Sequence, residues 1–198
     1  MMNVTSLFPT LVYRDERPEF VQQAIQNTKP YFDALQNEYR QNQYKAVFQT
    51  RSMVADQKLT LLSSYLKDSC IKILHEQGYK TDLYDFAVSG MWGHLVYKGG
   101  IHLPHIHPNS QLSGFYFLEA SNTSCFPMFS DPRPAKLMMD LQGQGTDKVH
   151  ASTSQVIFKD ILPGSVMFIN TWLTNEFTGN TSDIPTKFIH FFLKQKQK

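Results

Sequence analysis

The sequence "HLPHIHPNSQLSGFYFL", residues 102–118, places three histidines within six residues and then continues into an apolar strand. Residues at i and i+2 on a strand point to the same side, so His105 and His107 are expected to present two imidazoles toward one point. His102 has the wrong parity relative to His105 unless a turn intervenes at Pro104. An imidazole-rich site suits iron, zinc, copper or nickel. Ordinary surface or core histidines that make hydrogen bonds remain the alternative interpretation.

Around this stretch, a hydrophobic period of two predicts strands through the second half of the chain. Segments rich in β-branched or aromatic residues are broken by Gly, Pro, Asn and Asp, and they occupy residues 83–97, 110–120, 154–161, 164–172 and 187–195. The polar, glycine-containing residues 140–154 predict an exposed loop or lid.

The first 82 residues have a different pattern, which predicts helices that support the strands. Residues 55–79 form the best helix, with Asp56 to cap its start, Gly78 to end it and an apolar stripe of Leu59, Leu62, Leu66, Cys70 and Ile73. A second helical segment, residues 17–39, contains Pro30, which is expected to kink or split it. Helices followed by strands predict an α+β chain: one domain over residues 1–198, with a strand and helices in 1–82 and a β-sandwich or barrel in 83–198.

Composition bounds the classes of function. The 198 residues are 41% hydrophobic with a formal charge of +2, so we expect a packed core and neither a nucleic-acid nor a membrane partner. Cys70 and Cys125 give no disulfide framework, which is typical of a reduced, cytoplasmic setting. The N-terminal residues lack the pattern of a signal peptide, and no apolar run approaches the ~20 residues that span a bilayer.

Several separate motifs, in the right order, carry a resemblance to a known family. They are "MWGHLVYKGGIHLPHIHPNSQLSGFYFL" (residues 91–118), "LFPTLVY" (7–13), "FSDPRP" (129–134), "PGSVMF" (163–168) and "TWL" (171–173). In these the chain resembles the 2-oxoglutarate and iron(II)-dependent oxygenases that are similar to prolyl hydroxylases, in a branch found in bacteria and marine tailed phages. The resemblance implies a double-stranded β-helix (a jelly roll) with supporting helices, and iron(II) and 2-oxoglutarate as cofactors.

The resemblance also implies a set of site residues, with two departures from the family pattern. His105 and His107 match the metal-binding pair, and Asn175 stands where the family has a distal metal-binding His. Lys187 stands where the family has an Arg that binds the distal carboxylate of 2-oxoglutarate. Lysine keeps the charge without the bidentate fork of Arg. The amide of Asn175 is a poorer ligand than imidazole for such a metal.

Other residues are candidates to complete the metal site. His94 lies in the strand predicted at residues 83–97 and is expected to point into the barrel beside the cofactors. His190 has the opposite parity to Lys187, so if Lys187 points into the barrel, His190 points out. Glu176 would need a bulge to turn inward. A two-histidine centre completed by 2-oxoglutarate and water is a further alternative.

The polar groups near the predicted ligands have two interpretations each. Ser110, Ser113 and Tyr116 are candidates to hydrogen-bond a bound oxoacid, although Tyr116 is equally suited to core packing. Asp131 and Arg133 would contact substrate or form a local Asp-Pro-Arg turn.

Two functions follow from this pattern. The first is an active dioxygenase, which acts on 2-oxoglutarate and an unknown substrate. The second is a non-catalytic jelly roll that binds protein partners or its own copies, for example a phage virion or tail-associated protein, since one fold serves both purposes.

Overall fold

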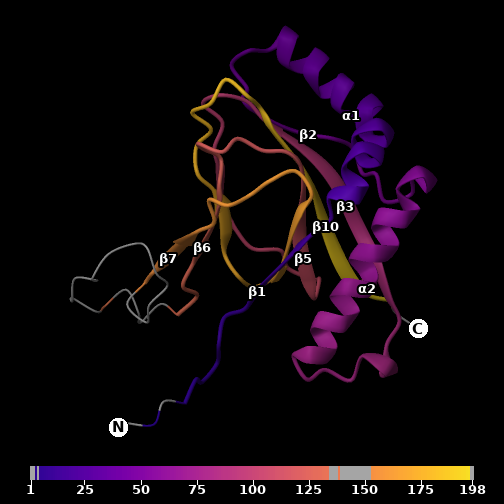
Figure 1. Ribbon diagram of the computed structural model, residues 1–198, viewed down its shortest axis with the longest axis vertical. Coiled ribbons are helices and arrows are strands. Elements are labelled where there is room, and N and C mark those ends of the chain that lie inside the picture. The colour runs from indigo at the N-terminus through magenta and orange to yellow at the C-terminus, as the bar shows by residue number, and fades with distance from the viewer. Residues whose placement is uncertain (1–2, 4, 134–137, 139–152, 197–198) are drawn as a thin grey trace.

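The computed structural model describes residues 3, 5–133, 138 and 153–196. Two antiparallel sheets form its β structure (Figure 1). One has the strand order β1 (Val12–Glu16), β8 (Ser165–Asn170), β5 (Leu112–Glu119), β10 (Thr186–Gln195), β3 (Phe86–Val96), β2 (Val47–Gln49). The other has the order β4 (His102–His105), β9 (Asn175–Phe177), β6 (Pro127–Ser130), β7 (Gln155–Ile157). The loop predicted at residues 140–154 lies outside the described residues except for its last two.

The helices cover one face of the larger sheet. They are α1 (Val21–Gln41) and α2 (Thr60–Glu76), with short 3-10 turns at Pro18–Phe20, Gln57–Leu59 and Thr81–Leu83. Figure 1 shows α1 and α2 on one side of β3 and β10, with β6 and β7 on the other. The combination of helices and antiparallel sheets agrees with the α+β prediction. Within the described part of the chain, neither helix is long and apolar enough to span a membrane.

The predicted apolar stripe is what attaches α2 to the sheet. Leu59, Leu62, Leu66, Cys70 and Ile73 are all buried in the core between the helices and the larger sheet. The Asp56 carboxylate accepts a hydrogen bond from the Lys58 amide (3.0 Å) at the start of this segment, and Gly78 adopts a positive φ just after α2. The α1 helix is not split at Pro30. A proline inside a helix costs ~3 kcal/mol, and the burial of Ala24, Phe32 and Leu35 offsets that cost.

Strand β10 separates the two cores of the molecule. It pairs with β3 on one side and with β5 on the other. Ile189, Phe191 and Leu193 face the helices. Phe188 packs instead against Phe177 of the smaller sheet, with ring centroids 4.6 Å apart. Alternate residues of β10 therefore point into the space between the two sheets.

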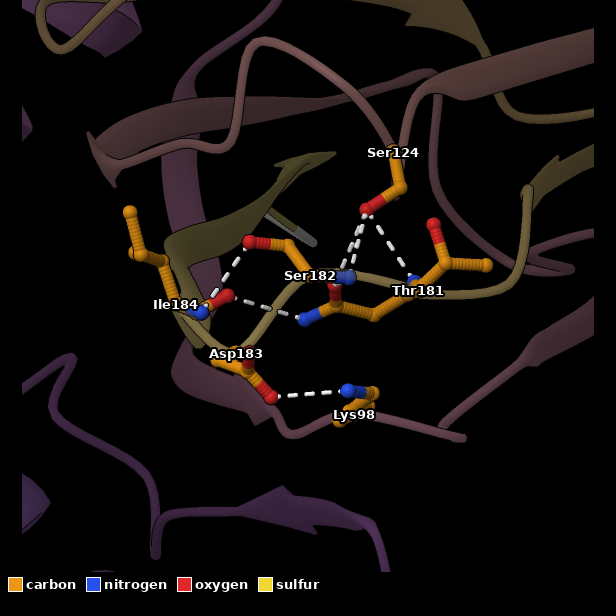
Figure 2. Close-up of polar contacts among 7 residues, drawn as sticks. Lys98, Ser124, Thr181, Ser182, Asp183 and Ile184 are labelled. Atoms are coloured by element: carbon orange, nitrogen blue, oxygen red, sulfur yellow. Dashed lines mark hydrogen bonds and ion pairs between the residues drawn. The ribbon is translucent and has the colours of Figure 1, made fainter.

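The loop before β10 is held by a compact hydrogen-bond network (Figure 2). The Ser124 hydroxyl donates to Asn180 Oδ1 (3.0 Å) and accepts from the amides of Thr181 (3.1 Å) and Ser182 (3.2 Å). The Asn180 side chain donates to the carbonyl of Val96, the last residue of β3 (2.9 Å). These bonds fix the chain where it enters β10, and so help to set which of its side chains face inward.

Replacing Ser124 with Ala is expected to lower the free energy of unfolding by about 1–3 kcal/mol, because it leaves buried partners without their hydrogen bonds. Urea denaturation of both proteins measures the difference. Ser182→Ala is the control, since within the described part of the chain the Ser182 hydroxyl accepts one hydrogen bond, from the Ile184 amide, in an exposed setting. Equal effects of the two substitutions would contradict the role given to Ser124.

Candidate functional site

Five imidazoles form a closed ring of contacts between the two sheets. They come from β3 (His94), from β4 (His102 and His105), from the residues just after β4 (His107) and from β10 (His190). Neighbouring ring centroids are 5.3 Å apart for His94–His102, 4.7 Å for His102–His105, 4.5 Å for His105–His107, 4.6 Å for His107–His190 and 5.6 Å for His94–His190. The histidines thus gather at one place in the fold.

The β4 segment brings His102 into the cluster because its register is irregular. His102 pairs with Phe177 and His105 pairs with Asn175 on β9, with a shift between the two pairs. The sequence predicted that His102 and His105 would face the same way only if a turn intervened at Pro104. The register shift between the two residues provides that change of direction. His107 then leaves the strand, and its amide donates to the Thr171 carbonyl (2.9 Å).

The two candidate residues on β10 lie on opposite faces of the sheet. His190 points inward and is 3% exposed. Lys187 points toward the helices, where its ammonium pairs with Glu119 (2.7 Å) and lies 5.9 Å from the centroid of the Phe32 ring. The opposite parity of the two residues was predicted, but the inward and outward positions are reversed. The structure therefore does not bring Lys187 together with the histidines.

Aromatic side chains wall the cluster on the inner face. The His94 ring stacks on Phe188 (5.0 Å, 6°), and His190 lies 4.7 Å from the ring centroid of Phe115 and 4.4 Å from that of Phe192. An apolar surround of this kind disfavours charge on the imidazoles.

The histidine pKa values follow from this burial. Desolvation, with smaller contributions from neighbouring rings, lowers the pKa of His94 to about 3 and those of His102 and His107 to about 4. The same causes lower the pKa of His190 well below its usual range. These four rings are therefore neutral at pH 7, the form in which an imidazole nitrogen binds a metal.

Each of these four rings has a buried nitrogen without a partner in the described residues. Nδ1 of His94 and of His102, and Nε2 of His107 and of His190, make no hydrogen bond within the described residues. Nδ1 of His105 is 2.7 Å from the Leu103 carbonyl. A carbonyl only accepts, so that nitrogen carries a proton, and in the neutral ring Nε2 of His105 keeps its lone pair. Unpartnered buried polar atoms are rare and call for an explanation.

The donor set fits a borderline divalent metal such as iron(II), which imidazole nitrogen binds well. Over the described ranges, however, no three His, Cys, Asp or Glu side chains already have their ligating atoms gathered around one point. Metal binding in this cluster therefore requires some imidazoles to rotate.

Asn175 lies beside the cluster, and its amide nitrogen is already engaged in hydrogen bonds. It is fully buried, and its Nδ2 donates to the carbonyls of His105 (3.2 Å) and Leu173 (3.3 Å). Its Oδ1 is buried with no hydrogen-bond partner in the described residues, so only this oxygen is free to contact a ligand. Glu176, next in the chain, is less buried and pairs with Met128 on β6.

The three candidates for binding an oxoacid are separated by the fold. Ser113 is fully buried opposite Phe192, and its hydroxyl has no partner among the described residues. Tyr116 packs in the core under the helices, and its hydroxyl donates to the Arg17 carbonyl (2.7 Å). Ser110 is half-buried, and its carbonyl accepts from the Thr171 hydroxyl (2.6 Å). Only Ser113 offers an unpartnered buried hydroxyl on the side of the aromatic wall.

Asp131 and Arg133 make the local turn that the sequence offered as one interpretation. The Asp131 carboxylate accepts from the Arg133 amide (3.0 Å) and pairs with its guanidinium (2.6 Å). These residues line a separate cavity of about 550 Å³ with residues 6–10 of the N-terminal segment.

The neutral cluster predicts that the metal-free protein loses stability in acid. The unfolded histidines take up protons below a pKa of about 6.5, whereas the folded pKa values of His94, His102 and His107 lie near 3–4. Stability is therefore retained above pH 6.5 and lost as the pH falls from 6.5 toward 4, by up to ~1.4 kcal/mol per pH unit for each ring. Urea denaturation at several pH values measures this slope, and His94→Phe should reduce it. A slope unchanged by His94→Phe would contradict the prediction.

Comparison with known proteins gives one family and one fold. Residues 90–187, about half of the chain, match the family model described as "Putative 2OG-Fe(II) oxygenase". This span includes four histidines of the cluster and excludes the fifth, His190. No curated protein sequence matches the chain.

Three solved structures illustrate the likeness in fold. HygX from Streptomyces hygroscopicus, with nickel and 2-oxoglutarate bound, is 10% identical and covers 93% of this chain and 83% of its own, with a TM-score of 0.58. A prolyl-4-hydroxylase from Pseudomonas putida is 7% identical and covers 95% and 94%, with a TM-score of 0.54. The viral collagen prolyl hydroxylase of Paramecium Bursaria Chlorella virus-1, in a 2-oxoglutarate complex, is 9% identical and covers 94% and 96%, with a TM-score of 0.51.

The family match includes His105 and His107 and the positions of Asn175 and Lys187, and the fold likeness extends over most of the chain. Iron(II) and 2-oxoglutarate are the cofactors of this family. The chain belongs to the 2OG-Fe(II) oxygenase family.

Proposed function

We propose that this protein is an iron(II)- and 2-oxoglutarate-dependent oxygenase, built as one jelly-roll domain over residues 1–198. The observation that carries the proposal is the cluster of imidazoles between the two sheets, four of which are neutral at pH 7 and have a buried nitrogen without a partner in the described residues. A domain that only needed a packed core would gain nothing from polar rings at these positions, because each unsatisfied buried group costs about 1–3 kcal/mol.

His105 and His107 would hold the iron, each through Nε2. When bound, iron(II) and 2-oxoglutarate supply the oxidising chemistry, which consumes O2 and releases succinate and CO2 as the substrate is hydroxylated. The hydrogen bond from His105 Nδ1 to the Leu103 carbonyl orients that ring, as such bonds do for metal ligands. Phe115, Phe188 and Phe192 would exclude water from the reacting groups.

In our proposal 2-oxoglutarate is held mainly by neutral donors. The Ser113 hydroxyl is free to donate to a carboxylate on the inner face, and Ser110 stands near the entry to β5 as a second candidate. Lys187 and Tyr116 are left out, because their polar atoms are engaged with Glu119 and with the Arg17 carbonyl on the helix side. Without a cationic partner, we expect weaker binding of the cosubstrate than a bidentate arginine would give.

An anaerobic titration tests this proposal. Metal-stripped protein is titrated with iron(II) and 2-oxoglutarate while the visible charge-transfer band of the chelated complex is recorded. We expect a band in the wild type that His105→Ala abolishes, whereas His75→Ala, on the exposed last turn of α2, leaves it in place. The absence of both the band and bound iron in the wild type would overturn the proposal.

The second candidate is a non-catalytic module that binds protein partners, such as a virion or tail component or a second copy of the chain. A row of outward-facing apolar residues on and beside β4 favours it: Ile101, Leu103 and Ile106 are each more than half exposed. Among the described strands, β4 pairs with β9 alone, so its other edge is open to a further strand. Light scattering of the wild type and of Leu103→Lys tests this candidate. Monomers of equal mass in both would exclude association through this edge.

A further inference from the structure

We propose that His190 is the third protein ligand of the metal, so that the site is an all-imidazole set of His105, His107 and His190. This inference rests on the proposed function, because it assumes that the cluster binds a metal. It assigns to β10 the role that the family pattern assigns to the position of Asn175.

The spacing of the three rings suits ligands of one ion. A metal–nitrogen bond of about 2.1 Å puts the centroid of each imidazole about 3.2 Å from the metal, so two rings bound at right angles lie about 4.5 Å apart. The observed centroid separations are 4.5 Å for His105–His107 and 4.6 Å for His107–His190. His107 is therefore the middle ring of the set, and the two outer rings close on the ion by rotation about their side-chain bonds.

The three rings also offer the same nitrogen. Nε2 of His107 and Nε2 of His190 are buried without a partner in the described residues, and Nε2 of His105 keeps its lone pair because Nδ1 donates to the Leu103 carbonyl. At His94 and His102 the buried nitrogen without a partner in the described residues is Nδ1 instead. The ring contacts of His107 among the described residues are with His105, His190 and Phe192.

The position of His190 is fixed by the most extensively paired strand of the larger sheet. It lies opposite Trp92 on β3 and opposite Phe115 on β5, and its ring is packed between aromatic neighbours. The Nε2 atom of His190 has lost its contact with water without gaining a hydrogen bond in the described residues. A bound metal supplies the missing partner for Nε2.

Asn175 is less suited to this role although it lies close by. Its Nδ2 donates to the carbonyls of His105 and Leu173, and these bonds hold the orientation of the amide. An amide oxygen is also a harder, weaker ligand for a borderline metal than an imidazole nitrogen. We assign Asn175 to positioning, because its bond to the His105 carbonyl connects β9 to the ligand strand.

The test measures binding of iron(II) alone, under anaerobic conditions, by competition with a chromophoric chelator. The variants are His190→Phe, which keeps an aromatic ring among aromatic neighbours, Asn175→Ala, and His75→Ala as the control histidine outside the cluster. We expect His190→Phe to weaken iron(II) binding by more than ~100-fold, since even residues behind the ligands contribute ~10–100-fold. Asn175→Ala should weaken it by less than that, and His75→Ala should match the wild type.

The outcomes separate this inference from the proposed function. If the wild type binds no iron(II), the metal site and the proposed function both fail. If the wild type binds iron(II) and His190→Phe binds it equally well, the inference is overturned while the proposed function stands. Thermal unfolding of the metal-free variants checks that they fold. If His190→Phe is unfolded, His190→Gln takes its place and is judged by the same criterion.

Discussion

Gly114→Ala is expected to lower the free energy of unfolding by more than ~3 kcal/mol, at the upper end of what overpacking costs. A Cβ at this position would lie 2.1 Å from the Met167 carbonyl oxygen and 2.5 Å from Cζ of Phe191. The oxygen belongs to the backbone of β8, which pairs with β5 at this point, so it moves only if the sheet moves. Urea denaturation followed by circular dichroism measures the loss.

Gly179→Ala is the matched control for Gly114→Ala. The nearest atoms to a Cβ at Gly179 belong to the flexible Ile101 side chain, the closest at 3.5 Å. We expect this variant to stay within about 0.5 kcal/mol of the wild type, as is usual for substitutions without a steric conflict. Comparable stability of the two variants would show that β5 and β8 are not packed as described.

Phe188→Ala is expected to cost about 3–5 kcal/mol of stability and also to weaken metal binding. The Phe188 ring is fully buried between His94 (5.0 Å) and Phe177 (4.6 Å), stacked nearly parallel to both. Its removal opens a cavity beside the histidine cluster, so that the imidazoles lose a surface that holds their orientation. Urea denaturation gives the first effect, and chelator competition for iron(II) gives the second.

Phe191→Ala separates the two effects of Phe188→Ala. Phe191 is as deeply buried on the same strand but faces the helices, where it packs against Phe168. We expect a similar loss of stability with iron(II) affinity within a few-fold of the wild type. Equal losses of iron(II) affinity in the two variants would mean that β10 does not direct alternate residues to the metal site.

The sequence predicted the parts of the site that depend on local spacing. His105 and His107 come together, as expected for residues two apart at a strand end. His94 faces the cluster, as predicted for the strand at residues 83–97. The apolar stripe from Leu59 to Ile73 is buried throughout, because apolar residues on one face of a helix pack toward the core.

The orientation of β10 could not be predicted in the same way. Both faces of this strand carry apolar residues, with Phe188 and the partly buried Phe192 on one side and the buried Ile189 and Phe191 on the other. A hydrophobic pattern assigns faces only when one of them is polar. The inward face of β10 was therefore predicted from Lys187 alone, as the residue expected to bind 2-oxoglutarate. In the structure Lys187 points outward and forms an ion pair with Glu119. His190 was missed as a member of the cluster for this reason.

Two other features depended on contacts distant in sequence. His102 reaches the cluster because β4 pairs irregularly with β9. Within β4, Pro104 is the residue that indicates this irregularity in the sequence. The predicted division into supporting residues 1–82 and a β core at residues 83–198 also does not separate the strands in the structure. Strands β1 and β2, from the first part of the chain, form the two edges of the larger sheet.

If the imidazoles of the cluster converge on one iron ion, X-ray absorption at the iron edge will detect them. The sample is anaerobic protein loaded with one equivalent of iron(II). We expect one bound ion whose spectrum shows the multiple scattering of three imidazole rings at bond lengths near ~2.1 Å. Iron that is surrounded by oxygen ligands alone, or protein that retains no iron, would contradict it.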